Sequence, residues 1–180
     1  MGEASYLAAM LENLGVAARL DGIEKPLQPG PVDLSALVER LLARHRPLAA
    51  RRDVALDGAG PGSPTMVEAD LALLEQALGN LVYNAVTYNA AGGHVAVTLH
   101  AHGGGWELRV LDDGPGIPPD ELARVTERGY RGAGSRAIAS KGHGLGLHIT
   151  SSVLALHGFS LELTNPPEGG LLARVRGPLG

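Results

Sequence analysis

Several common features are missing from the 180-residue sequence, and each absence narrows the range of functions. It has no cysteine, which excludes disulfides and thiolate metal sites and is typical of a reducing compartment. No apolar run approaches the roughly 18 residues that span a bilayer. The N-terminus also lacks the charged head and apolar run of a signal sequence. We therefore expect a cytoplasmic segment that makes no membrane contact itself.

Aromatic residues and excess basic charge are also scarce. Aromatics make up 3% of the chain, and the formal net charge is −4 with 19% charged residues. This composition gives no basic field for nucleic acid and no polybasic segment for a membrane surface. The chain is instead rich in glycine, with 26 residues, and is 44% hydrophobic. That content is sufficient for one compact domain with a buried core.

A proline-rich stretch divides the chain near its start. Residues 5–20 repeat apolar side chains at close to a 3.6-residue period and predict an amphipathic helix. Residues 25–31 then separate this helix from the rest. We predict a boundary here, with residues 1–25 as a helix tail and linker and residues 26–180 as the main domain.

Helical and alternating patterns follow one another through the main domain. Apolar periodicity and the capping residues Asp33 and Asp70 predict helices at 33–52 and 70–88, and a third follows the glycines near 142 and ends at Gly158. Alternation and glycine-rich turns predict strands at 53–57, 94–101, 106–111, 160–164 and 171–176. Residues 118–141 show little periodicity after Val125 and predict a mobile loop above a site. Strands in one layer and helices in another indicate a two-layer α/β sandwich.

Two asparagines mark the helix predicted at 70–88. Asn80 and Asn84 are four residues apart and therefore share one helix face, about 6 Å apart along the axis. A buried amide must find hydrogen-bond partners, and a lone asparagine commonly bonds neighbouring backbone. A pair on one face favours a ligand site, because the neutral amide oxygen suits Mg²⁺.

Two glycine-containing segments follow. At 111–118 (LDDGPGIP), Asp112 ends a strand as a fixed acceptor, and Gly114 and Gly116 let the backbone turn beneath a ligand, although the sequence is also a good plain turn. At 142–146 (GHGLG), alternate glycines lead into an apolar helical segment. Free N–H groups at a helix N-terminus favour an anion such as phosphate.

Together these segments resemble the motifs of a known family. Residues 80–85 (NLVYNA), 112–117 (DDGPGI) and 142–147 (GHGLGL), in this order and spacing, resemble the ATP-binding catalytic domain of sensor histidine kinases. That family is grouped with DNA gyrase and with heat-shock chaperone and mismatch-repair ATPases. The resemblance covers about residues 30–178. It implies the Bergerat fold, in which a mixed, mostly antiparallel sheet packs on three main helices.

The resemblance also implies ligands and roles. ATP and Mg²⁺ would bind, with Asn84 as the Mg²⁺ ligand, Asn80 as a supporting polar contact and the Tyr88 ring against adenine. Asp112 would accept a hydrogen bond from the adenine amino group. The base pocket would be shaped by Gly114, Gly116 and Ile117, and the phosphate loop by Lys141, Gly142, His143, Gly144, Leu145 and Gly146. A lid at 118–141 would close over the triphosphate. His143 could contact a phosphate, but a solvent-facing loop histidine is the favoured interpretation.

Two positions bear on the reaction. Gyrase-like relatives carry a water-activating glutamate where this chain has Asn80, and an amide cannot act as a general base, so phosphoryl transfer is favoured over ATP hydrolysis. Thr87 stands where a Lys or Arg commonly reaches a phosphate. Any side-chain cation must then come from Arg128, Arg131, Arg136 or Lys141.

The phosphoacceptor motif of these kinases is absent from the sequence. None of the seven histidines begins a His-Glu or His-Asp sequence with a downstream proline. His45, followed by Arg46 and Pro47, comes nearest, and we interpret it as a surface helix residue.

The partners implied by the resemblance are a phosphoacceptor helical domain, of which residues 1–25 would be the tail, and indirectly a response regulator. Membrane anchoring of the parent protein is left open.

Other classes fit less well. Residues 132–137 (GAGSRA) match a dinucleotide-binding fingerprint, but neither the preceding strand nor the later acidic residue is present. A P-loop is excluded because no Gly-Lys-Ser/Thr sequence occurs. An anti-sigma-factor-type serine kinase and a non-catalytic nucleotide-sensing module share the implied fold and stay open as alternative functions.

His100 and His102 lie on one strand face and are interpreted as a solvated pair, because two ligands make no metal site.

Overall fold

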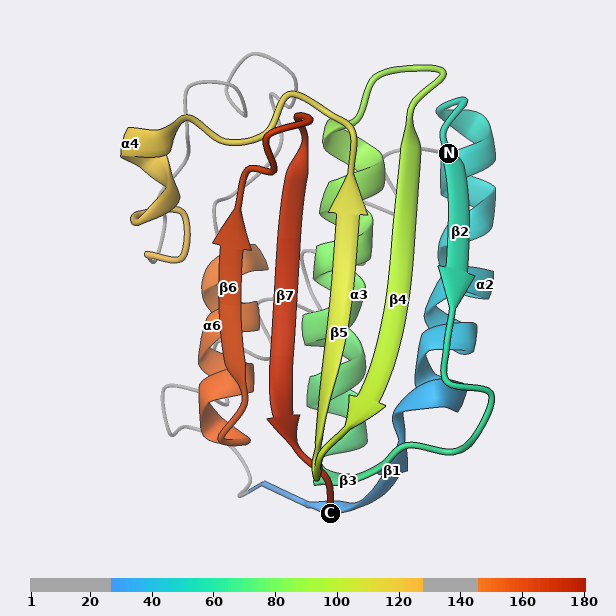
Figure 1. The fold of residues 1–180 in the computed structure, drawn as a ribbon, viewed down its shortest axis with the longest axis vertical. Helices are drawn as coiled ribbons and strands as arrows, with labels where there is room; N and C mark the ends of the chain where they lie inside the picture. Colours follow the sequence, from blue (N-terminus) through green and yellow to red (C-terminus); the bar gives the residue numbers. More distant parts are fainter. Residues whose placement is uncertain (1–26, 128–145) are drawn as a thin grey trace.

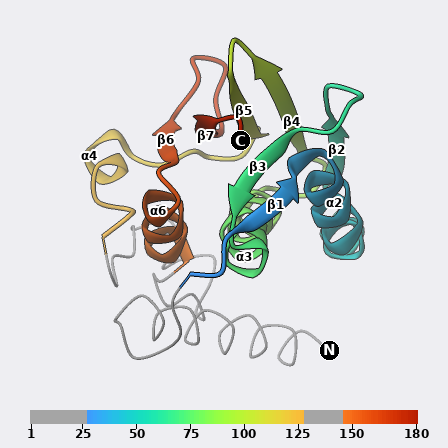
Figure 2. The ribbon, with the colours of Figure 1, turned by 90° about the horizontal axis from the view of Figure 1, so that it is seen from below.

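The computed structural model describes residues 27–127 and 146–180, and in them a sheet and a helical layer lie face to face. Figure 1 shows the sheet in front of the helices, and Figure 2 shows α2, α3 and α6 together on one side of it. The main helices are α2 (Leu34–Arg51), α3 (Leu71–Tyr88) and α6 (Gly146–Leu156). The two-layer α/β sandwich with three main helices is confirmed.

The main sheet has five strands in the order β2-β4-β5-β7-β6. Its β2–β4 pairing is parallel and the other three are antiparallel, so it is mixed and mostly antiparallel as predicted. The strands are β2 (Ala55–Ala59), β4 (His94–His102), β5 (Gly105–Asp112), β6 (Ser160–Thr164) and β7 (Leu171–Pro178).

Alternate residues of the central strands form the core. Apolar side chains point from the sheet toward the helices because successive strand residues face opposite sides. Buried examples are Val95, Val97 and Leu99 of β4, Trp106, Leu108 and Val110 of β5, and Ala173 and Val175 of β7. Leu37 and Leu41 of α2 and Leu74 and Leu78 of α3 cover them. None of the helices in the described part of the chain is long and apolar enough to cross a membrane.

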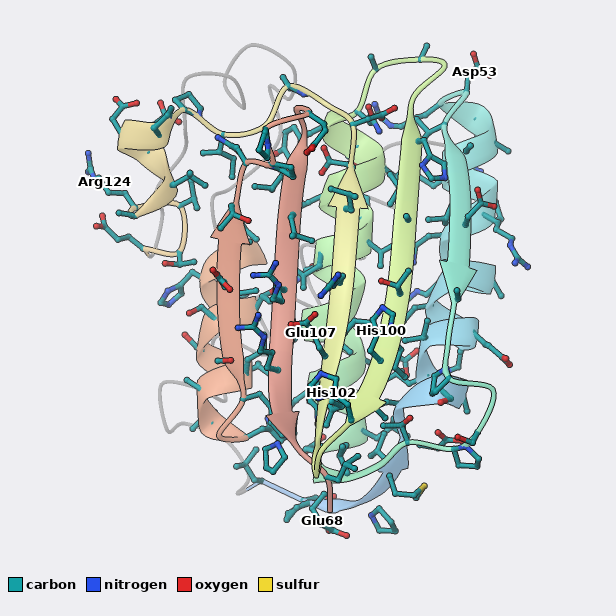
Figure 3. All side chains as sticks on the ribbon, in the orientation of Figure 1. Asp53, Glu68, His100, His102, Glu107 and Arg124 are labelled. Carbon is teal, nitrogen blue, oxygen red and sulfur yellow. The ribbon has the colours of Figure 1, made fainter. Side chains whose placement is uncertain are left out.

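The opposite face of the sheet carries charged side chains. Glu107 of β5 lies there beside its register partner His100 of β4 (Figure 3). Burial acts to raise the pKa of Glu107, but hydrogen bonds from Arg176 and Arg109 outweigh it and lower the pKa. His100 and His102 are exposed, and no cluster of three possible metal ligands occurs in the described residues.

A second, two-stranded sheet was not predicted. It pairs β1 (Gly30–Asp33) with β3 (Met66–Ala69) in antiparallel register. The sequence around β1 reads as a proline-rich linker, and its partner lies more than 30 residues away, so no local pattern signals the pair. Asp33 joins this sheet to α2, because its Oδ1 accepts hydrogen bonds from Ser35 N at 2.9 Å and Thr65 N at 3.0 Å.

Element ends differ from the prediction by a few residues. The strand expected at 53–57 begins only at Ala55, because Asp53 adopts a left-handed conformation with φ of 55°. The last helix ends at Leu156 rather than at Gly158, whose φ is 70°. The expected loop at 118–141 begins with a short helix, α4 (Pro119–Leu122). Residues 128–141 and the predicted boundary at 25–26 fall outside the described residues or at their edge.

Candidate functional site

The two asparagines of α3 face the first residue of α6. Asn80 Nδ2 lies 3.5 Å from the Gly146 carbonyl oxygen. A Cβ at Gly146 would lie 3.9 Å from Asn80 Cγ and 4.0 Å from Asn84 Nδ2. The helix that follows the glycine-rich sequence therefore starts directly over the asparagine pair. The first residue of α6 and two side-chain amides of α3 meet at this point.

Apolar contacts and one hydroxyl hold α6 in this position. Ile149 and Val153 of α6 are fully buried against Leu73 and Ala77 of α3. Thr150 is also fully buried, and its Oγ1 lies 3.1 Å from the Ala77 carbonyl oxygen and 2.9 Å from that of Gly146. The hydroxyl thus connects the start of α6 to the middle of α3, one turn before Asn80.

Asp112 is a buried carboxylate at the end of β5. It is 9% exposed, and its Oδ1 accepts hydrogen bonds from the backbone N–H groups of Gly114 at 3.0 Å and Leu171 at 3.3 Å. Burial raises the pKa of Asp112, the two N–H donors oppose that shift, and neighbouring Asp113 adds to it. The net pKa is raised. Such a carboxylate is a fixed acceptor that gains from a further donor.

The backbone after Asp112 lies against the end of α3. A Cβ at Gly114 would stand 3.0 Å from Asp112 Oδ1 and 3.5 Å from the Tyr88 carbonyl oxygen. Tyr88 is four residues beyond Asn84, which places it one helical turn further along α3. The loop that starts at Asp112 and the helix that carries the asparagines are therefore in contact.

Asp113 lies in a different environment from Asp112. Its Oδ1 accepts hydrogen bonds from His94 N at 2.7 Å and Asn89 Nδ2 at 2.9 Å. The His94 N–H is the largest influence and lowers the pKa of Asp113, with Asn89 adding to the effect. Asn89 is the C-cap of α3, so Asp113 links the end of this helix to β4. The two adjacent aspartates are thus shifted in opposite directions.

Two residues that shape the site were missed by sequence reasoning. Asn165 and Gly170 lie in the turn between β6 and β7, and both contact the loop from Asp112 to Ile117. A Cβ at Gly170 would fall 1.8 Å from the Asp112 carbonyl oxygen, so only glycine fits there. The sequence NPPEGG predicts a hairpin turn, and nothing local indicates a contact about 50 residues away.

Part of the predicted site is not described. The structure places Asn80, Asn84, Tyr88, Asp112, Gly114, Gly116, Ile117 and Gly146. Outside the described residues lie Lys141, Gly142, His143, Gly144 and Leu145, together with the candidate cations Arg128, Arg131 and Arg136. Thr87 is 6% exposed, and its carbonyl accepts a hydrogen bond from Arg52 Nη1 at 3.0 Å.

The interpretation of His45 as a surface residue is wrong. The residue is 8% exposed, and its ring lies between α2 and α3, where Cε1 would be 3.8 Å from a Cβ at Gly79. Nδ1 donates to the Leu41 carbonyl oxygen at 2.8 Å, which uses one ring nitrogen within the helix. Burial, the largest influence, lowers the pKa of His45. The burial of His45 could not be predicted from its neighbours, because Arg44 and Arg46 on either side of it are both exposed.

The donor set around Asn84 suits a Mg²⁺ ion that is bound mainly through other ligands. No group of three acidic or histidine side chains that could hold a metal occurs within residues 27–127 and 146–180. Asn84 lies near the first residue of α6, and its side-chain amide oxygen would provide one hard ligand. Waters and phosphate oxygens would then supply the remaining ligands of the ion.

Comparison with known proteins agrees with this architecture. Residues 69–180 match the family described as histidine kinase-, DNA gyrase B- and HSP90-like ATPases. The sensor-like histidine kinase SenX3 of Mycobacterium tuberculosis (strain ATCC 25618 / H37Rv) is 35% identical over 168 residues. That alignment covers 93% of this chain and 41% of SenX3, so the chain spans less than half the length of this relative.

Solved structures show the same fold. The mycobacterial sensor histidine kinase MprB superposes with a TM-score of 0.72 at 32% identity, over 84% of this chain and 98% of that chain. Full-length ShkA in complex with AMPPNP gives a TM-score of 0.79 at 28% identity, over 99% of this chain and 37% of that chain. From its sequence match and its fold, the chain belongs to the histidine kinase-, DNA gyrase B- and HSP90-like ATPase family, as a catalytic ATPase domain of the sensor histidine kinase type.

Proposed function

We propose that this domain binds ATP with Mg²⁺ and delivers the γ-phosphoryl group to a histidine on a separate helical domain. The observation that carries the proposal is the contact of three distant segments. Asn80 and Asn84 face the first residue of α6, and the loop from Asp112 lies against the end of the same α3 helix. An amide pair, a helix N-terminus and a buried carboxylate then suit the metal, phosphate and base ends of one nucleotide.

At the phosphate end, Asn84 would supply the metal ligand and Asn80 a supporting polar contact. The bound Mg²⁺ would neutralise charge on the phosphate oxygens. Gly146 contributes a backbone without a Cβ at the closest approach to both amides. The preceding residues Lys141, Gly142, His143, Gly144 and Leu145 are proposed to continue the phosphate loop.

At the base end, Asp112 would accept a hydrogen bond from the adenine amino group. Its Oδ1 is held by the backbone N–H groups of Gly114 and Leu171. Gly114, Gly116 and Ile117 would form the pocket floor, and the ring of Tyr88 would lie against the base. Because the carboxylate is buried, a donor in the ligand compensates part of its desolvation.

The role of Asn80 separates transfer from hydrolysis. An amide cannot take a proton from water, so no general base is supplied from this position. The domain would act by positioning the phosphoryl group and by neutralising its charge, while the attacking imidazole comes from the helical domain. Residues 1–25 would be the tail of that domain. We further propose a response regulator downstream and a cytoplasmic location, where ATP is supplied.

The test has two steps. Isothermal titration with ATP and ADP, with and without Mg²⁺, should show binding that Mg²⁺ strengthens for ATP. The domain is then mixed with labelled ATP and a separately produced helical domain of a related sensor kinase, such as SenX3, that carries the phosphoacceptor histidine. Acid-labile label on that histidine is expected. Binding without transfer would favour a nucleotide-sensing module, and acid-stable label on serine an anti-sigma-factor-type kinase.

A further inference from the structure

The turn between β6 and β7 is hydrogen-bonded to the loop that follows Asp112. Asn165 uses both ends of its side-chain amide on one residue: Oδ1 accepts from Ile117 N at 3.1 Å, and Nδ2 donates to Ile117 O at 2.5 Å. The amide thereby satisfies the backbone donor and acceptor of Ile117 as a neighbouring strand would. These two residues are 48 positions apart in the sequence.

The other end of the same loop is held by the same turn. Leu171 N donates to Asp112 Oδ1 at 3.3 Å, and Gly170 lies directly against the Asp112 carbonyl. Asp112 and Ile117 are therefore both held by residues of the β6–β7 connection and by Leu171, the first residue of β7. The segment between them spans a distance set by that connection.

Gly116 shows how closely Asn165 approaches the loop. Its φ is 67°, and a Cβ there would fall 2.8 Å from the Gly170 carbonyl oxygen and 2.9 Å from Asn165 Oδ1. Gly116 is thus confined both by its left-handed backbone and by the amide beside it. Moving Asn165 would release the residue that turns the chain beneath the proposed base.

We propose that Asn165 is a positioning residue for base recognition, which acts through the backbone of Gly116 and Ile117. It holds the loop in the position in which an adenine amino group can reach Asp112. The inference rests on the proposed nucleotide binding and adds a fourth segment to the site. This segment lies outside the three sequence motifs.

The test compares two substitutions with one control. Asn165→Ala removes both hydrogen bonds, and the near-isosteric Asn165→Asp replaces the donor to Ile117 O with a repelling oxygen. Glu168→Ala, exposed in the same turn, is the matched control. For each chain, affinity for ADP and for inorganic triphosphate is measured by titration. Exchange of the Ile117 amide proton is followed by NMR.

The two asparagine variants are expected to lose about three- to tenfold in ADP affinity, as two exposed hydrogen bonds would give. Triphosphate affinity should stay within twofold, because the asparagine pair and α6 are untouched. Ile117 should exchange faster in both variants, and the control should match wild type. Unchanged ADP affinity, unchanged Ile117 exchange, or an equal loss for both ligands would overturn the inference. A wild-type chain that bound no ADP would overturn the proposed function as well.

Discussion

At the scale of single residues, the two adjacent aspartates show how local surroundings divide one sequence motif into two roles. Asp113 is exposed, and the His94 and Asn89 donors lower its pKa. Asp112 is buried, and its pKa is raised. A raised pKa means that folding disfavours the ionised form. Asp112 therefore costs stability at neutral pH, which is expected of a residue kept for binding rather than for folding.

The first prediction concerns Asp112→Asn. The amide oxygen still accepts from Gly114 and Leu171, but its nitrogen would meet the adenine amino group donor to donor. We expect ADP affinity to fall about 10- to 100-fold, the range for a hydrogen bond to a charged group. The unfolding temperature should stay the same or rise, since a buried charge is removed. Titration and thermal unfolding measured together test this, and lower stability with full affinity would contradict it.

The same carboxylate predicts a pH dependence. The pKa of Asp112 is raised on folding, so its protonated form stabilises the folded state. This contribution to the free energy of unfolding is fully present below the ordinary aspartate pKa and is lost as pH rises through the raised pKa. Nucleotide binding should run the opposite way and weaken as pH falls through that value. ADP affinity measured against pH would show the decline beginning above the ordinary aspartate range. In Asp112→Asn this part of the profile should be flat.

Asn84 carries a prediction about the metal. With Asn84→Ala the ratio of ATP affinity in the presence and absence of Mg²⁺ should fall toward one, because the only proposed protein ligand is gone. Asn84→Asp retains a hard oxygen and should keep the Mg²⁺ dependence. Calorimetry at fixed ATP and varied Mg²⁺ measures the ratio. An alanine variant with full Mg²⁺ dependence would exclude Asn84 as a ligand.

At the scale of secondary-structure elements, the sequence was most informative where one local pattern sufficed. The periodicity of α3, its cap at Asp70 and the β4–β5 hairpin all follow from neighbouring residues. The β1–β3 pair and the contact of Asn165 with Ile117 join segments far apart in the chain, so no local pattern reports them. His45 was misjudged for a related reason, since its burial depends on a glycine of another helix.

The packing of α6 on α3 gives the next prediction. Thr150→Val keeps the side-chain shape but removes the hydroxyl that bonds the Ala77 and Gly146 carbonyl groups. We expect a loss of about 1 kcal/mol in the free energy of unfolding. ATP affinity should fall with it, because the start of α6 is less firmly held over Asn80. Ser151→Ala in the same helix is the control, and chemical denaturation with titration provides both readouts.

At the scale of the whole molecule, the domain is expected to hold nucleotide without modifying itself. His45 is buried and its Nδ1 donates to the Leu41 carbonyl oxygen, so its ring is poorly placed to reach a phosphate. Incubation of the chain alone with labelled ATP should give no acid-labile phosphate. Labelled His45 in a peptide digest would contradict both this expectation and the buried position.

The central claim is that α3, the loop after Asp112 and the start of α6 form one site for a magnesium-bound adenine nucleotide. The most direct measurement is an NMR titration of the ¹⁵N-labelled chain with ADP and Mg²⁺. We predict that the largest shifts gather on the Asn84 side chain and on the Gly114, Ile117 and Gly146 amides, with one common dissociation constant. Shifts confined to one of the three segments, or centred on another face of the sheet, would contradict it.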